Sequence, residues 1–235
     1  MIPLLIGKNS SGEDQVIDLS DIGLLMISYC EEEQFMGMFE RILNAPDSHK
    51  SFNYIITNSR RIDEWKIGTD NSNVFLKDEP EMGTLQTRLE LLSMINKEMI
   101  RRKGIMLKKK VKDFERYVSL NTWNQEKLTH SFLLIDDIWD IVTAKPKSLA
   151  LNLINIFLNG PSVGIHTVFA SGISYRNLLE QLVTINPKIK IELQNKYGIP
   201  EPTRINSMGH EIIYSPDGLI FYKDAVNNEL MKLYP

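Results

Sequence analysis

The sequence lacks several features that would place it in a specialised class of protein. Cys30 is the only cysteine among 235 residues, so an internal disulfide bond is excluded, which fits a reducing compartment. No apolar run approaches the roughly 20 residues of a membrane-spanning helix, and we expect no direct insertion into a membrane. The net charge of -3 gives no general attraction to nucleic acid, although it does not exclude a local basic patch.

A further absence concerns the loop at residues 28–35, which joins an apolar run at residues 24–27 to a helical pattern at residues 36–43. A strand, a loop of this length and a helix are the setting of the phosphate-binding P-loop, G-x-x-x-x-G-K-[ST]. In a P-loop, glycines allow backbone amides to close around phosphate oxygens, and the lysine supplies positive charge. This loop contains neither glycine nor lysine.

The residues that replace the P-loop pattern are unsuited to holding a nucleotide. Ser28 and Glu33 occupy the two glycine positions. Gln34 replaces the lysine, Phe35 replaces the metal-binding hydroxyl, and Glu31 adds negative charge. A carboxylate about 4 Å from a phosphate costs roughly 4 kcal/mol at an effective dielectric constant near 20. The alternative is an ordinary strand-to-helix turn whose acids favour the helix N-terminus, and the two interpretations are compatible.

Short apolar runs alternate with helical patterns through the middle of the chain. The runs predict buried strands at residues 24–27, 52–57, 131–135 and 167–170. Helices are predicted at residues 36–43, from the turn near Pro80 to Gly104, at 149–158 and at 175–182. The alternation predicts a mainly parallel sheet covered on both faces.

Both ends of the chain have hairpin patterns. Residues 4–7 and 15–19 flank a polar turn, and residues 211–214 and 219–222 flank the turn Ser215-Pro216-Asp217-Gly218, with a short tail at residues 230–235. No linker, internal repeat or low-complexity tract interrupts the sequence. We therefore expect residues 1–235 to form a single domain, excised from a larger protein.

Four further segments resemble, in order and spacing, the FtsK/SpoIIIE-type domains of the P-loop ATPases. They are residues 98–102 (EMIRR), 132–137 (FLLIDD), 160–166 (GPSVGIH) and 169–172 (FASG). The second is similar to the Walker B strand, and the last occupies the place of a sensor. The resemblance implies an α/β, RecA-like P-loop NTPase fold with a central sheet flanked by helices.

The departures from this family pattern are consistent with one another. Asp137 is one methylene shorter than the usual catalytic glutamate, Pro161 replaces an arginine that reaches a neighbour's nucleotide, and Gly172 replaces the sensor glutamine. Only Asp136 keeps its family role intact. Because phosphoryl transfer needs a metal ion, a lysine and a water-positioning group, we expect no catalytic residue and no bound cofactor or metal here, although active relatives use ATP and magnesium.

This pattern of departures resembles the degenerate domains of the EssC/EccC coupling proteins of type VII secretion. The resemblance implies a soluble domain of a membrane-anchored protein, at the cytoplasmic face of the cell membrane. It also implies two kinds of partner, which are adjacent ATPase domains of the same chain and small secreted helical-hairpin substrates. We expect the isolated domain to be a monomer that binds no DNA.

Two other functions remain open on the sequence alone. Asp136 and Asp137 could hold magnesium in a weak ATPase, or a basic stretch at residues 101–103 and 108–112 could contact DNA phosphates in a translocase motor. The alternative for the basic stretch is a solvated helix end. We expect His166 to cap the turn that enters the fourth strand rather than to act as a base, and Trp139 to pack in the core or at a subunit interface.

Overall fold

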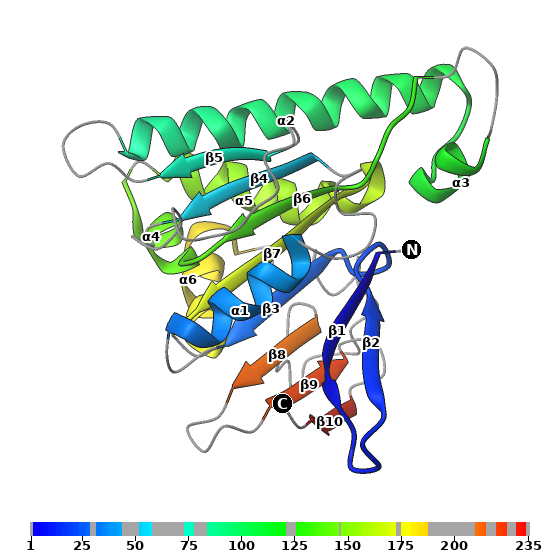
Figure 1. The fold of residues 1–235 in the computed structure, drawn as a ribbon. Coiled ribbons are helices and arrows are strands. Elements are labelled where there is room, and N and C mark those ends of the chain that lie inside the picture. The colour runs from blue at the N-terminus through cyan, green and yellow to red at the C-terminus, as the bar shows by residue number, and fades with distance from the viewer. Residues whose placement is uncertain are drawn as a thin grey trace.

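The computed structural model describes residues 2–28, 32–43, 52–57, 73–77, 84–120, 126–145, 147–172, 175–187, 210–214, 220–224 and 229–233. These residues form a large sheet with helices on both faces and a separate two-stranded hairpin near the N-terminus (Figure 1). The α/β class predicted from the sequence is confirmed.

The large sheet has the strand order β10-β9-β8-β3-β7-β6-β4-β5. Six neighbouring strands are parallel, and the last two strands of the chain are antiparallel. The parallel strands are β3 (Leu24–Ser28), β4 (Phe52–Thr57), β5 (Asn73–Lys77), β6 (Ser131–Ile135), β7 (Ile165–Ser171) and β8 (His210–Tyr214). The antiparallel strands are β9 (Ile220–Asp224) and β10 (Glu229–Leu233). The predicted mainly parallel sheet is therefore confirmed.

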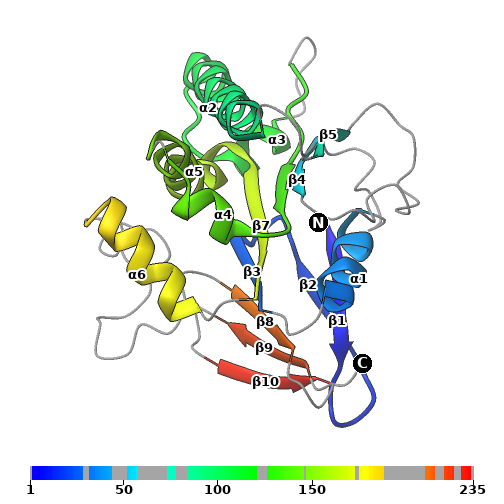
Figure 2. The ribbon, with the colours of Figure 1, turned by 90° about the vertical axis from the view of Figure 1, so that its left-hand side faces the viewer.

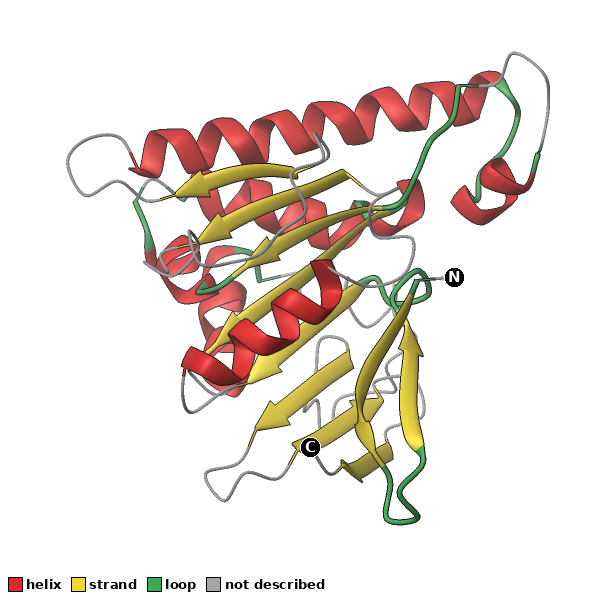
Figure 3. Ribbon diagram, viewed as in Figure 1, coloured by secondary structure: helices red, strands yellow, loops and turns green. Residues whose placement is uncertain are grey.

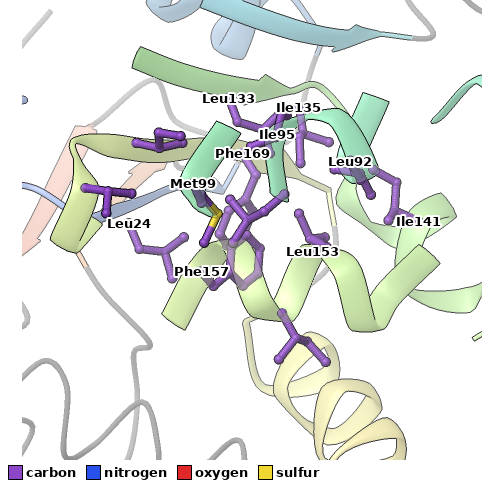
Figure 4. Close-up of a cluster of buried hydrophobic side chains, with 14 of the residues drawn as sticks. Leu24, Leu92, Ile95, Met99, Leu133, Ile135, Ile141, Leu153, Phe157 and Phe169 are labelled. Atoms are coloured by element: carbon purple, nitrogen blue, oxygen red, sulfur yellow. The ribbon is translucent and has the colours of Figure 1, made fainter. Parts of the chain in front are cut away.

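The central strands β3, β6 and β7 are buried on both faces, which explains their continuous apolar sequences. Along β3, Leu24 and Met26 belong to one hydrophobic cluster, whereas Leu25 and Ile27 belong to the other. Helices α2, α4, α5 and α6 cover the first face, and α1 with the hairpin covers the second (Figure 2). In the first cluster, side chains of α2 and α5 meet those of β6 and β7 (Figure 4).

The helices are α1 (Glu32–Leu43), α2 (Thr84–Lys108), α3 (Phe114–Ser119), α4 (Ile138–Thr143), α5 (Ser148–Asn159) and α6 (Tyr175–Ile185). The prediction that the long helix ends near Gly104 is wrong, because α2 continues to Lys108. Met106 is buried in the cluster that already holds Leu92, Ile95 and Met99, so packing extends the helix through the glycine. The short helices α3 and α4 and the strands β5 and β10 were not predicted.

Both predicted hairpins are present (Figure 3). Strand β1 (Pro3–Lys8) pairs with β2 (Asp14–Asp18), and β8 pairs with β9, in both cases antiparallel. The residues predicted as a tail instead contribute to β10, which extends the sheet beyond β9. Among the described residues, no helix has the length and apolar character required to cross a lipid bilayer.

Candidate functional site

The carboxyl edge of the parallel sheet, where the strand arrowheads in Figure 1 end, brings several sequence-predicted residues together. Ser28 ends β3 directly beside Ser171, which ends β7. Ile135 of β6 pairs with Phe169, so Asp136 and Asp137 leave the sheet at the same edge. Ligands of open α/β sheets bind at this edge, where the strand order reverses around a central strand such as β3. The edge is therefore the candidate site.

The Walker A-like loop meets the candidate site at the N-terminus of α1. This helix begins at Glu32, so Glu33, Gln34 and Phe35 all lie in its first turn. Residues 29–31, which include Cys30 and Glu31, lie outside the described residues. A helix N-terminus carries partial positive charge from its unpaired amides and attracts anions. In this chain, the sequence supplies carboxylates to that position.

Asp137 is the N-cap residue of α4. Its carboxylate oxygen accepts a hydrogen bond of 2.9 Å from the backbone amide of Trp139. This contact satisfies one of the amides that every helix leaves unpaired at its start. The Trp139 side chain packs against the hydrophobic cluster under α4, which confirms the predicted core packing. The residue at the position of the catalytic glutamate therefore has a structural partner.

Asp136 and Ser171 form the deeper part of the site. Asp136 exposes only 4% of its surface, and Ser171 is fully buried on the neighbouring strand. Among the residues that the structure describes, no group of three or more histidine, cysteine, aspartate or glutamate side chains is arranged to hold a metal ion. In a nucleotide site, magnesium is usually held by one or two carboxylates together with phosphate oxygens and water. Asp136 lies at the position where the family resemblance places such a carboxylate.

The two remaining sequence-predicted positions do not lie together. Gly172 is exposed at the end of β7, on the carboxyl edge. Pro161 begins a short 3-10 helix, η3 (Pro161–Val163), which precedes β7 and lies at the opposite, amino edge of the sheet. The structure thus separates the proline from the other candidate residues by the length of a strand.

His166 has a different role from the one predicted. It lies within β7 and is buried, with its Nδ1 2.8 Å from the carbonyl oxygen of Ile22, ahead of β3. Its Nε2 lies 2.9 Å from Nδ1 of His130. Because a carbonyl can only accept, a neutral His166 donates from Nδ1 and accepts a hydrogen bond from His130 at Nε2. The predicted cap of the turn before β7 is wrong, since the imidazole ties β7 to the segment before β3.

Burial lowers the pKa of both imidazoles. The pKa of His166 is lowered to about 3 and that of His130 to about 4, because desolvation disfavours the charged form. Arg102 contributes a smaller repulsion to each. At the surface end of the pair, Nε2 of His130 lies 3.3 Å from the carboxylate of Glu115. Both histidines are therefore neutral at pH 7.

A buried arginine at the amino edge was missed from the sequence. Arg102 exposes 4% of its surface and donates hydrogen bonds to the carbonyl oxygens of Thr129, at 2.8 Å, and Val163, at 3.1 Å. It also donates to the hydroxyl oxygen of Ser131 and to the carboxylate of Glu98. The available signal was its position in α2, three residues after Met99 and four before Met106, on the buried face.

This arrangement reduces the basic stretch that could contact DNA. Arg102 is unavailable to a ligand because it is buried and bonded to backbone carbonyls. Arg101 donates to the carboxylates of Glu98 and Glu126, which neutralise it at the surface. The exposed cations that remain in the stretch are lysines: Lys103, Lys108, Lys109, Lys110 and Lys112.

Comparison with known proteins identifies the fold. No protein-family model matches the sequence. The EssC fragment of Geobacillus thermodenitrificans that contains ATPases 2 and 3 superposes with a TM-score of 0.65 over 100% of this chain and 44% of that one, at 15% identity. This is the fold of an FtsK/EssC-type ATPase domain. The corresponding EccC fragment of Thermomonospora curvata, in complex with a signal sequence peptide, superposes with a TM-score of 0.59 over 99% of this chain and 40% of that one, at 13% identity.

A sequence relative agrees with the structural matches. The DNA translocase FtsK of Treponema pallidum (strain Nichols) is 24% identical over 234 residues, which cover 94% of this chain and 28% of that protein. The chain thus spans less than half the length of each of these three proteins. At these identities the comparison shows the fold alone, which is the fold that the resemblance of the sequence motifs implied.

Proposed function

We propose that this chain is a non-catalytic ATPase-fold domain of a type VII secretion motor, which binds neighbouring ATPase domains of its own chain and small secreted helical-hairpin substrates. The observation that carries the proposal is the start of α1, whose first residues are Glu32 and Glu33. A P-loop helix meets a phosphate at this point. Here the first turn of the helix contains two glutamates, and Gln34 replaces the lysine. A triphosphate would therefore be repelled by the carboxylates and would have no compensating cation.

The Walker B-like position supports the same conclusion. A catalytic carboxylate must be able to orient the attacking water. Asp137 is shorter than glutamate, and one of its oxygens accepts the hydrogen bond that caps α4. Gly172 lacks the functional group of the sensor glutamine, and Pro161, at the amino edge, lacks that of the arginine. We therefore assign ATP and magnesium to active relatives and no cofactor to this domain.

The proposed partners are based on the domains and the peptide found with similar domains in solved structures. The EssC and EccC fragments that share this fold each contain two ATPase domains, and the EccC fragment is in complex with a signal sequence peptide. In such an assembly this domain would act from the cytoplasmic face of the membrane by docking. It would transmit substrate occupancy to active neighbours through a coupling free energy of typically about 1–3 kcal/mol.

Calorimetric titration with magnesium and ATP tests the absence of nucleotide binding. We expect no saturable heat with the natural chain at millimolar nucleotide. The matched control is the triple variant Glu33→Gly, Gln34→Lys, Phe35→Thr, which restores the second glycine, the lysine and the hydroxyl of the P-loop pattern. It should gain measurable affinity if these positions are responsible.

The alternative function gives the opposite result. Saturable, magnesium-dependent binding by the natural chain that disappears in Asp136→Ala would overturn the proposed absence of nucleotide binding and favour a weak magnesium ATPase. Binding that survives in Asp136→Ala would also contradict it, because nucleotide would then be held without the Walker B-like acid.

A further inference from the structure

The outer face of α2 has an apolar line that the domain itself does not cover. Ile100 exposes 73% of its surface and Leu107 exposes 58%. With Gly104 between them, these residues follow the spacing i, i+4, i+7, which places all three on one face of the helix. The opposite face of α2, with Leu92, Ile95, Met99 and Met106, is the one that packs in the hydrophobic core. The line therefore makes no contribution to the core.

No contact within the described part of the fold requires a glycine at position 104. A Cβ atom built on it would meet nothing within 4 Å, and its backbone φ is not in the left-handed region. Glycine in the middle of a helix is unfavourable relative to alanine, because it loses more conformational freedom on folding. What glycine offers is a surface without a side chain, where another backbone can approach closely. Its position between two exposed apolar residues is that of a helix crossing point.

The line is flanked by positive charge. Lys97 and Lys103 are each three residues from Ile100, and Lys108 is four residues from Gly104, so the cations lie beside the apolar line. All three lysines are exposed. A complementary surface has apolar and small residues at its centre and carboxylates at its flanks. That description fits an amphipathic helix with acidic edges.

We propose that the outer face of α2, defined by Ile100, Gly104 and Leu107 with their flanking lysines, docks an acidic amphipathic helix of a partner protein that crosses α2 at Gly104. The inference names a partner surface for the proposed function and rests on that function for the protein that supplies the helix. DNA fits this surface less well, because the apolar side chains of the line cannot bind phosphate groups and because Arg102 is buried. An anionic membrane fits it less well, because Gly104 would have no role there.

Fluorescence anisotropy with the full chain tests this surface. The probe is a labelled synthetic helix with alanine and leucine along one face and glutamate on both flanks, compared with the same peptide in which lysine replaces glutamate. We expect binding of the acidic probe only. Ile100→Glu and Leu107→Glu should each weaken that binding at least about tenfold. Met94→Glu is the matched control, because Met94 is also exposed on α2 but lies away from the line, and its effect should stay below about twofold.

Gly104→Ala separates docking from folding. The added methyl group should raise the melting temperature, because it meets open space in a helix. It should nevertheless weaken binding of the acidic probe about three- to tenfold, because it separates the two helices. A variant that gains both stability and affinity would contradict the proposal. So would acidic-probe binding that is insensitive to Ile100→Glu.

Two further ligands complete the test. Salt-dependent binding of duplex DNA that is lost on neutralising Lys108, Lys109 and Lys110 but unchanged by Ile100→Glu, without binding of the acidic probe, would replace the proposal with a nucleic-acid surface. Binding to phosphatidylglycerol vesicles in place of the probe would replace it with a membrane surface. The nucleotide titration does not involve α2. Nucleotide binding in that titration would overturn the proposed function, but the docking experiment on α2 could still be interpreted.

Discussion

The two edges of the parallel sheet use their polar groups differently. At the amino edge, Arg102 and His166 are buried and hydrogen-bonded to backbone carbonyls from segments distant in sequence. At the carboxyl edge, Asp137 caps the helix that follows it, and α1 begins with acids of its own chain. The amino edge therefore holds distant segments of the domain together, whereas the contact that Asp137 makes at the carboxyl edge is local. Substitutions at the two edges should differ accordingly in their effect on stability.

The largest loss in the free energy of unfolding is expected for Arg102→Met. The substitution removes hydrogen bonds to the carbonyls of Thr129 and Val163 and to the hydroxyl of Ser131, and it leaves the Val163 carbonyl and the Ser131 hydroxyl buried without these bonds. We expect a loss of about 3–5 kcal/mol in the free energy of unfolding, measured by urea denaturation.

Arg101→Met is the matched control for this prediction. Arg101 is the neighbouring residue and shares Glu98 as a partner, but its ion pairs are at the surface. Its loss should be below about 1 kcal/mol. Equal losses for the two variants would contradict the assignment of the amino edge as the part that holds the domain together.

The second prediction concerns pH. Because the pKa values of His130 and His166 lie below the ordinary value of 6.5 in the folded state, the unfolded chain binds protons more tightly. Stability should therefore be complete above about pH 6.5 and fall as the pH approaches 4. From about pH 7 to about pH 5, we expect a loss of about 2 kcal/mol from His130 alone, measured as the shift of the urea midpoint.

The charged groups around the histidine pair define the control. His130 faces Glu115 of α3 and Arg102 of α2, with Asp18 of β2 farther away. Asp18 and Glu98 have pKa values below their ordinary range, so their contribution is lost only at lower pH than this window. In His130→Gln the slope between about pH 7 and 5 should become shallower. An unchanged slope would mean that other groups control it.

The third prediction is steric and again compares two positions. In Gly160→Ala, the new Cβ would lie 2.5 Å from the carbonyl oxygen of Ile165 and 2.6 Å from that of Ile156. Since both obstacles are backbone atoms at the amino edge, we expect a loss of about 1–3 kcal/mol in the free energy of unfolding. Gly37→Ala in α1 is the control, because nothing lies within 4 Å, and it should leave stability unchanged or improve it. Similar losses for the two variants would contradict the steric explanation.

Much of the sheet could be predicted from the sequence, for a physical reason. Parallel strands in the middle of a covered sheet are short apolar runs, and β4 and β6 have the predicted bounds. Strand β5 was missed because Asn73–Lys77 begins and ends with polar residues, as an edge strand can. The end of α2 was misplaced because a glycine after basic residues is typical of a helix C-terminus, whereas the burial of Met106 decides the outcome.

The candidate site could be predicted from the sequence only in part. Asp136 and Asp137 follow an apolar run, so their place at the carboxyl edge was predictable from strand order alone. The burial of Arg102 was not, because its partners Thr129 and Val163 are 27 and 61 residues away in sequence. Nor could the capping contact of Asp137 be predicted, since the six residues of α4 are too few to give a helical period.

The smallest effect is expected at the carboxyl edge, for Asp137→Ala. The substitution removes the carboxylate that accepts from the amide of Trp139, so we expect a loss of about 0.5–2 kcal/mol, typical of an N-cap. Asp137→Asn keeps an oxygen acceptor and should recover most of the loss, which urea denaturation can resolve. If Asp137→Asn were as destabilising as Asp137→Ala, the negative charge would matter more than the cap. The carboxyl edge would then depend on charge, as an edge that holds a cation would.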